Sequence, residues 1–183
     1  ESALNQRDCD VELIIVDDCS LDDTYGVMRS YAERHANIKI SRIQETATFS
    51  GGKKMAVTIG VKAASHEHLV FTDADCLPAS DTWLYEMAVA LDQRPIVLGY
   101  SPLRKAPGIL NKLIRFDTFF IGMQYLGFAK LGMPYMGVGR NMGYRSNIFF
   151  DQKGFSGHYD IASGDDDLLL NAVANSNNTK VVF

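Results

Sequence analysis

The sequence predicts an α/β protein with a mostly parallel sheet flanked by helices. Short apolar segments that end at acidic or polar residues alternate with longer amphipathic segments between residues 12 and 100, in the order strand–helix–strand–helix–strand–helix–strand. This alternation is typical of parallel strands joined by right-handed crossover helices. Ligands of such sheets bind beyond the carboxyl ends of the strands, so the residues that follow each strand are the first candidates for a site.

The predicted strands of the first half are short, apolar and rich in β-branched residues. They cover residues 12–16, 38–43, 68–72 and 96–100. The helices between them are predicted at residues 21–35, from residue 53 onward, and at 80–93. We expect the first helix to be capped by Ser20 or Asp22, because their side-chain oxygens can accept hydrogen bonds from the free N–H groups of a first turn.

The second half of the chain is less regular. The composition of residues 108–131, rich in Phe, Met and Gly, predicts one or two amphipathic helices. A strand is predicted at residues 141–146, and a helix that opens with three acids at residues 164–174. The sequence contains no internal repeat or linker, and we expect one domain over residues 1–183.

Composition limits the class of protein. The 183 residues are 46% hydrophobic and 22% charged, which is typical of globular domains. A net charge of −4 argues against a nucleic-acid partner. Three cysteines without a C-x-x-C spacing, and an opening segment with no apolar signal region, favour a reducing, cytoplasmic location.

Two carboxylates follow the apolar strand 68–72. Asp73 and Asp75 are separated only by Ala74, so both can reach one divalent cation. Mg²⁺ and Mn²⁺ favour carboxylate oxygens and keep positions for water and phosphate. The alternative is that the two acids only shape a turn or cap the next helix. Cys76, which follows them, is expected to be a small buried residue and not a nucleophile.

Four further patterns lie at predicted strand ends or helix starts. Asp17 and Asp18 follow the first strand, and Lys53 follows a glycine pair at a helix start, where an ammonium and free N–H groups can meet a phosphate. Residues 139–145 are polar at alternate positions and suited to line a cleft, and residues 165–167 are three acids. Three of them have a structural alternative: helix capping for the residues after the first strand, a solvated basic pair for Lys53, and acids matched to a helix dipole for residues 165–167.

Taken in order, these patterns resemble the family 2 glycosyltransferases, which have the GT-A fold. The segments that carry the resemblance are VDDCSLDDT at 16–24, GKKMAVTIG at 52–60, FTDADC at 71–76, GRNMGYRS at 139–146 and SGDDDLL at 163–169. The three-acid segment and GRNMGY are most similar to bacterial polysaccharide synthases. The resemblance implies a GT-A sheet whose first strand is missing here, with a nucleotide-binding half at residues 1–100 and an acceptor and catalytic half at residues 101–183.

The resemblance also implies an activity. The family moves a sugar from a nucleotide-diphosphate donor, most often a UDP-sugar, to a hydroxyl of a glycan or lipid-linked acceptor. The reaction inverts the anomeric carbon and uses Mg²⁺ or Mn²⁺. A membrane partner would be reached through parts of a longer parent chain.

Site residues follow from the same resemblance. Asp17 or Asp18 would contact the nucleobase or ribose, and Lys53 would lie near the nucleotide. Asp73 would contact the nucleotide and share in holding the metal, and Asp75 would be the main metal ligand. The remaining assignments are the catalytic base Asp166 with Asp165 beside it, and the substrate-binding residues Arg140 and Asn141.

Departures from the family pattern keep two alternatives open. Thr58 replaces the usual asparagine of the GK segment, and no Q-x-x-R-W-like motif follows the acidic helix, so we expect a fragment of a longer enzyme. The first alternative is a metal-dependent nucleotidyltransferase, which would release pyrophosphate where a glycosyltransferase releases UDP. The second is a non-catalytic binding or assembly module.

Overall fold

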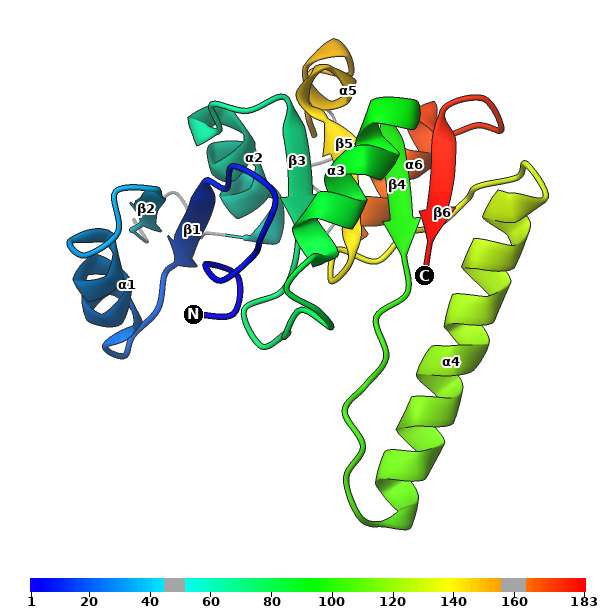
Figure 1. Cartoon of the computed structure of the whole chain (residues 1–183), viewed down its shortest axis with the longest axis horizontal. Helices are drawn as coiled ribbons and strands as arrows, with labels where there is room; N and C mark the ends of the chain where they lie inside the picture. The colour runs from blue at the N-terminus through cyan, green and yellow to red at the C-terminus, as the bar shows by residue number, and fades with distance from the viewer. Residues whose placement is uncertain (45–51, 156–163) are drawn as a thin grey trace.

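The computed structural model describes residues 1–44, 52–155 and 164–183. Strands β1 (Leu13–Asp18) and β2 (Ile38–Ile43) form a parallel pair in which Leu13 lies opposite Ile38 and Asp18 opposite Ile43. Helix α1 (Thr24–Ala32) lies on the outer side of this pair (Figure 1). In β2 the two end residues, Ile38 and Ile43, are buried.

A second sheet has four strands in the order β3-β5-β4-β6. The strands are β3 (His68–Phe71), β5 (Met142–Arg145), β4 (Ile96–Gly99) and β6 (Thr179–Val182). Strand β5 is antiparallel to both β3 and β4, whereas β4 and β6 are parallel. Thus β3, β4 and β6 run in one direction and β5 runs against them. The predicted α/β class is confirmed, with strands of both halves of the chain in one sheet.

Six helices are present among the described residues. After α1 they are α2 (Lys53–Ala63), α3 (Trp83–Gln93), α4 (Ile109–Lys130), α5 (Ser146–Asp151) and α6 (Asp165–Val173). Helix α2 connects the two sheets. Its Gly60 approaches Val16 of β1 closely, and its Val61 belongs to the hydrophobic cluster that contains Leu69 of β3.

Strand β4 is the centre of the core. Ile96, Val97 and Leu98 are completely buried, with Ile96 and Leu98 in one cluster and Val97 in a second cluster formed with α3. Because both faces of β4 are covered, its sequence is continuously apolar and does not alternate. This buried strand fixes the edge of the sheet at which Gly99 and the following residues emerge.

Helix α4 extends away from the sheets. Residues 108–131 form one helix, not two, and its N-terminal end projects with the preceding loop beyond the body of the protein (Figure 1). In the part of the chain that the structure describes, no helix combines the length and the apolar character needed to cross a membrane.

Several local expectations were wrong or incomplete. Helix α1 begins at Thr24 with Asp23 at its N-cap position, although Asp23 makes no side-chain cap hydrogen bond. Oδ1 of Asp22 accepts a hydrogen bond of 3.0 Å from the N–H of Thr24, so Asp22 supplies the first-turn bond expected of it. Ser20 does not, because its own N–H donates to Asp17 in a turn that precedes the helix. The short elements α5 and β6 were not predicted from the sequence.

Candidate active site

The two acids at the end of β1 have different surroundings. The side chain of Asp17 is fully buried: its Oδ1 accepts a hydrogen bond from the N–H of Ser20 at 3.0 Å, and its Oδ2 lies 3.1 Å from Nε of Arg42. The Arg42 contact is an ion pair without hydrogen-bond geometry. Asp18 is exposed. The alternation of a strand therefore leaves Asp18 as the carboxylate of this pair that can meet a ligand.

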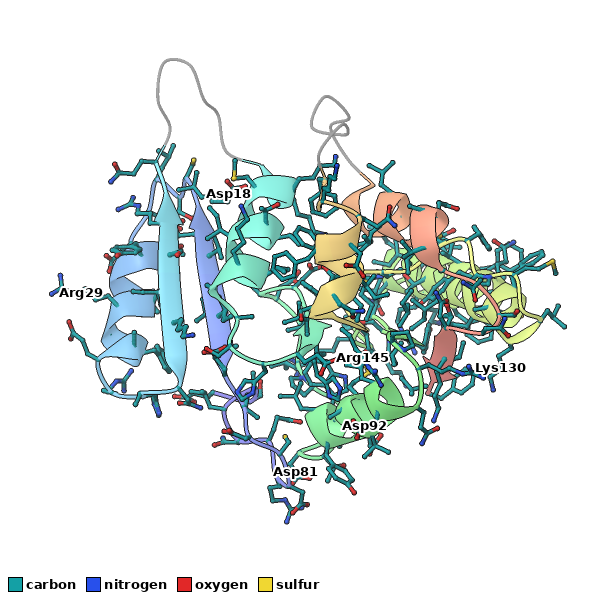
Figure 2. The ribbon with its side chains drawn as sticks, turned by 90° about the horizontal axis from the view of Figure 1, so that it is seen from above. Asp18, Arg29, Asp81, Asp92, Lys130 and Arg145 are labelled. Atoms are coloured by element: carbon teal, nitrogen blue, oxygen red, sulfur yellow. The ribbon has the colours of Figure 1, made fainter. Side chains whose placement is uncertain are left out.

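Asp18 connects the end of β1 to the start of α2. Its Oδ1 accepts a hydrogen bond of 2.9 Å from the N–H of Gly52, the N-cap residue of α2. Figure 2 shows Asp18 beside this end of α2, on the side of the molecule away from Asp81 and Asp92. The acidic pair after β1 and the glycine–lysine segment at the start of α2 are therefore in contact.

The two lysines of α2 also differ. Lys54 is buried, and with Thr58 and Val61 it forms the inward face of the helix. Lys53 is exposed, and its Nζ lies 3.7 Å from Oδ2 of Asp166 at the start of α6. Lys53 therefore joins the second pattern to the acidic helix, 113 residues further along the chain.

The carboxylate of Asp166 lies beside one hydrogen-bond donor and one positively charged group. The N–H of Gly139 donates to Oδ2 of Asp166 at 2.7 Å, in addition to the nearby ammonium of Lys53. The neighbouring Asp167 accepts a weaker bond, of 3.3 Å, from the N–H of Gly137. Backbone N–H groups and ammonium groups stabilise an ionised carboxylate. Asp165 is the first residue of α6, and its side chain lies outside the described part of the structure.

The register of the second sheet places the Asp73–Asp75 turn at the same edge. Phe71 of β3 and Leu98 of β4 both lie opposite Met142, the first residue of β5. The turn after β3 and the residues before β5 therefore emerge at one edge, at the carboxyl ends of β3 and β4. Gly139, which holds Asp166, is three residues before Met142.

The turn after β3 gathers three potential ligand groups. The carboxylates of Asp73 and Asp75 and the thiol of Cys76 have ligand atoms within 4.8 Å of one another. The N–H of Cys76 donates to the carbonyl of Asp73 at 3.0 Å, which closes the turn. Carboxylate oxygens suit Mg²⁺ or Mn²⁺, whereas a thiol does not, so the donor set fits such an ion through Asp73 and Asp75. Cys76 is half-buried and not buried as expected.

Asn141 and Arg140 have distinct positions beside this edge. The side-chain N–H of Asn141 donates to the carbonyl of Tyr100 at 2.9 Å, and its Oδ1 accepts from the indole of Trp83 at 3.0 Å. The amide of Asn141 therefore makes structural hydrogen bonds through both its nitrogen and its oxygen, which connect it to Tyr100 and Trp83. Arg140 is half-buried and lines, with Tyr100 and Ser101, a small pocket of about 50 Å³.

Tyr125 of α4 also lines this pocket and was not predicted from the sequence. Its hydroxyl donates to the carbonyl of Gly99 at 2.8 Å, and the residue is 2% exposed. Burial raises the pKa of Tyr125 to about 12, partly offset by the positive charge of Arg140. The hydrogen bonds from Gly137 and Gly139 to the acidic helix were also not predicted, although Gly139 is the first residue of the predicted cleft segment GRNMGY.

The structure thus brings most of the predicted site residues together. Hydrogen bonds and an ion pair link Asp18, Lys53, Asp166 and the residues before β5, and the Asp73–Asp75 turn joins them through the sheet register. Such an edge offers carboxylates for a divalent cation, an ammonium and free N–H groups for phosphate, and a separate ionised carboxylate for proton removal.

Comparison with known proteins identifies the family. The model of the family described as glycosyl transferase family 2 matches residues 1–151, which is most of the chain. The chain therefore belongs to glycosyl transferase family 2, as its sequence patterns predicted. This membership favours sugar transfer over nucleotidyl transfer.

The similar proteins include a bacterial enzyme. The poly(ribitol-phosphate) beta-N-acetylglucosaminyltransferase TarS of Staphylococcus aureus, from strains Mu50 / ATCC 700699 and MW2, is 32% identical over 82 residues. The match covers 45% of this chain and 13% of the length of TarS. A mycobacterial protein of known crystal structure aligns over 75% of this chain and 44% of its own length, with a TM-score of 0.45 and 19% identity.

Proposed function

We propose that this chain transfers a sugar from a UDP-sugar to a hydroxyl group of a glycan, polysaccharide or lipid-linked acceptor, with inversion at the anomeric carbon. The observation that carries the proposal is the position of Asp166. Gly139 and Lys53 hold its carboxylate at the sheet edge where the Asp73–Asp75 turn also emerges. A base and a diphosphate site at one edge are the two requirements of this reaction.

The donor would be held at its nucleotide and at its diphosphate. Asp18 is the exposed acid at the end of β1, and we assign it to the ribose or nucleobase, while buried Asp17 supports the turn. Lys53 lies at the start of α2, where its ammonium can face a phosphate. Asp73 and Asp75 would hold Mg²⁺ or Mn²⁺. Such an ion stabilises the charge that develops on the departing diphosphate.

Asp166 would act as the general base. A base works in its ionised form and must lie near the proton that it removes, and the N–H of Gly139 and the ammonium of Lys53 favour that form. Its carboxylate takes the proton of the acceptor hydroxyl as the oxygen bonds to C1 of the sugar. The bond from C1 to the diphosphate breaks at the same time. Attack from the face opposite to the leaving group inverts C1.

The relatives support a β-linked product. The name of TarS describes a β-specific transfer of N-acetylglucosamine to poly(ribitol-phosphate). A β-link formed from an α-linked nucleotide sugar requires inversion, which a single base brings about by activating the acceptor hydroxyl. A polymeric acceptor of that kind would place the reaction in polysaccharide biosynthesis. Arg140, in the pocket beside the site, is assigned to substrate contact.

The products distinguish this proposal from nucleotidyl transfer. The protein is incubated with individual UDP-sugars, Mn²⁺ or Mg²⁺ and glycan acceptors, and the nucleotide products are separated by chromatography. We expect free UDP that appears only with a divalent cation, and a β-anomer in the NMR spectrum of the product. Release of pyrophosphate, or an α-linked product from an α-linked donor, would overturn the proposal.

A further inference from the structure

Helix α4 carries a row of exposed apolar side chains. Ile109, Leu113, Phe116, Phe120 and Met123 follow one another at intervals of four, three, four and three residues, which places them on one face of the helix. Their exposed fractions lie between 44% and 76%. We call these five residues the α4 stripe.

From Ile109 to Phe120 the α4 stripe faces away from the body of the protein, whereas Met123, its last residue, lines an apolar pocket with Tyr100 and Phe183. On the C-terminal half of the helix the buried residues are Gly122, Tyr125, Leu126 and Ala129, which pack on the second sheet and its core cluster. At the rotation of an α-helix, Tyr125 and Ala129 lie on the side opposite to the stripe. The N-terminal half projects beyond the sheets (Figure 1). The exposed row is therefore not the packing face of the helix.

The charge around the stripe differs in sign from that of the rest of the chain. Residues 102–135 contain one acid, Asp117, and five basic residues, so they carry a net charge of +4. The other residues, with 13 basic and 21 acidic side chains, carry −8. The basic residues of the segment are Arg104, Lys105, Lys112, Arg115 and Lys130.

This charge distribution favours an anionic surface over a second copy of the chain as the partner of the α4 stripe. A second copy packed on the same face would bring two segments of charge +4 together, which is repulsive. An anionic lipid surface attracts the same segment while the acidic remainder of the protein is kept away from it. A helix with an exposed apolar face, flanking basic residues and no capacity to span is typical of helices that lie in a membrane interface.

We propose that α4 binds the surface of an anionic membrane, with the α4 stripe in the boundary between headgroups and acyl chains. The basic residues Arg104, Lys105 and Lys112 lie beside the N-terminal end of the stripe and contact lipid phosphates. This inference uses no residue of the proposed active site and does not depend on the proposed function. It assigns the projecting end of α4 to membrane attachment.

The test is co-sedimentation of the protein with vesicles. One set contains phosphatidylcholine alone, and the other contains equal parts of phosphatidylcholine and phosphatidylglycerol. We expect binding to the anionic vesicles that weakens as salt is added, because salt screens the basic residues. The double variant Phe116→Ser/Phe120→Ser should bind at least about tenfold more weakly. Both side chains are exposed, so the variant should remain folded.

Matched controls separate the stripe from general apolar exposure and charge. Tyr85→Ser/Val89→Ser removes two exposed apolar side chains from α3 and should leave binding unchanged. Lys105→Gln/Lys112→Gln should lower binding to anionic vesicles by roughly thirtyfold, whereas Lys62→Gln on α2 should not.

Three results would overturn the inference. One is the absence of binding to anionic vesicles at low salt. Another is binding that the Phe116→Ser/Phe120→Ser variant retains in full. The third is that the unchanged protein does not bind vesicles but forms a dimer in analytical ultracentrifugation, and that the Phe116→Ser/Phe120→Ser variant is a monomer. A second copy of the chain would then be the partner of the stripe.

Discussion

Gly139 offers a direct test of how the proposed base is positioned. Its N–H donates to Oδ2 of Asp166, and a Cβ added at this position would lie 2.7 Å from Oδ2 and 3.0 Å from Oδ1. Ordinary contacts to a Cβ begin at 3.4 Å, so Gly139→Ala must push the carboxylate back by about 0.7 Å. Gly139 does not have a positive φ, so alanine brings no backbone strain of that kind.

A displacement of this size should act on turnover. Misplacement by about 1 Å can lower a rate by about a hundredfold, so we expect kcat to fall by roughly 10- to 100-fold, or about 1.4 to 2.7 kcal/mol. The dissociation constant of the donor should change by less than about twofold, because in the proposed reaction Asp166 meets the acceptor hydroxyl and not the nucleotide. Initial rates of UDP release and calorimetric titration with the donor measure the two quantities separately.

Gly127 is the matched control. It lies within α4, and a Cβ added there meets no atom within 4 Å. Gly127→Ala should leave kcat unchanged and raise the free energy of unfolding by up to about 1 kcal/mol. A folded Gly139→Ala protein with full kcat would refute the positioning of Asp166. Equal losses in donor binding and turnover would also refute it, because Gly139 would then act on the donor.

Three further predictions concern the base, a buried ion pair and a buried hydroxyl. Asp166→Asn should lower kcat by at least about a hundredfold with donor binding retained, since the amide cannot take a proton; near-normal turnover would remove Asp166 as the base. Arg42→Ala leaves the fully buried carboxylate of Asp17 without its ion pair, and chemical denaturation should show a loss of about 2 kcal/mol. The exposed Arg29 pair is the control, and Arg29→Ala should cost less than about 0.5 kcal/mol; equal losses for both variants would contradict the account. Tyr125 has a pKa raised to about 12 in the folded protein against an ordinary value near 10. The folded state keeps this proton while the unfolded state loses it, so stability is complete below about pH 10 and falls by about 3 kcal/mol as pH rises to about 12. Tyr125→Phe should lack this part of the alkaline loss; an unchanged pH profile would show that Tyr125 does not titrate as described.

The sequence predicted the fold well where local patterns decide it. The alternation in residues 38–43 predicted β2 with its observed limits, and the apolar run at 96–100 predicted the buried strand β4. The strand β6 was missed because four residues, Thr179–Val182, carry little periodicity, and their pairing with β4 is a tertiary contact. Likewise, the apolar pattern of α4 predicted a helix but not which of its faces would remain exposed.

The site was predicted as a set of patterns but not as a set of contacts. Two adjacent acids, Asp17 and Asp18, are equivalent in the sequence, and only the folded strand buries one and exposes the other. The hydrogen bond from Gly139 to Asp166 joins residues 27 positions apart, with β5 and α5 between them, and no local pattern specifies it. Asn141 remains a predicted substrate contact, although its amide already bonds Tyr100 and Trp83.

The central claim is that the carboxylates after β3 hold a metal that binds the diphosphate of the donor. Calorimetric titration of the protein with UDP tests it most directly, in Mn²⁺ and again in excess chelator, with Asp75→Ala beside the unchanged protein. The account predicts UDP binding in Mn²⁺ that is lost in chelator and lost in Asp75→Ala. Binding of equal affinity in chelator, retained by Asp75→Ala, would contradict it.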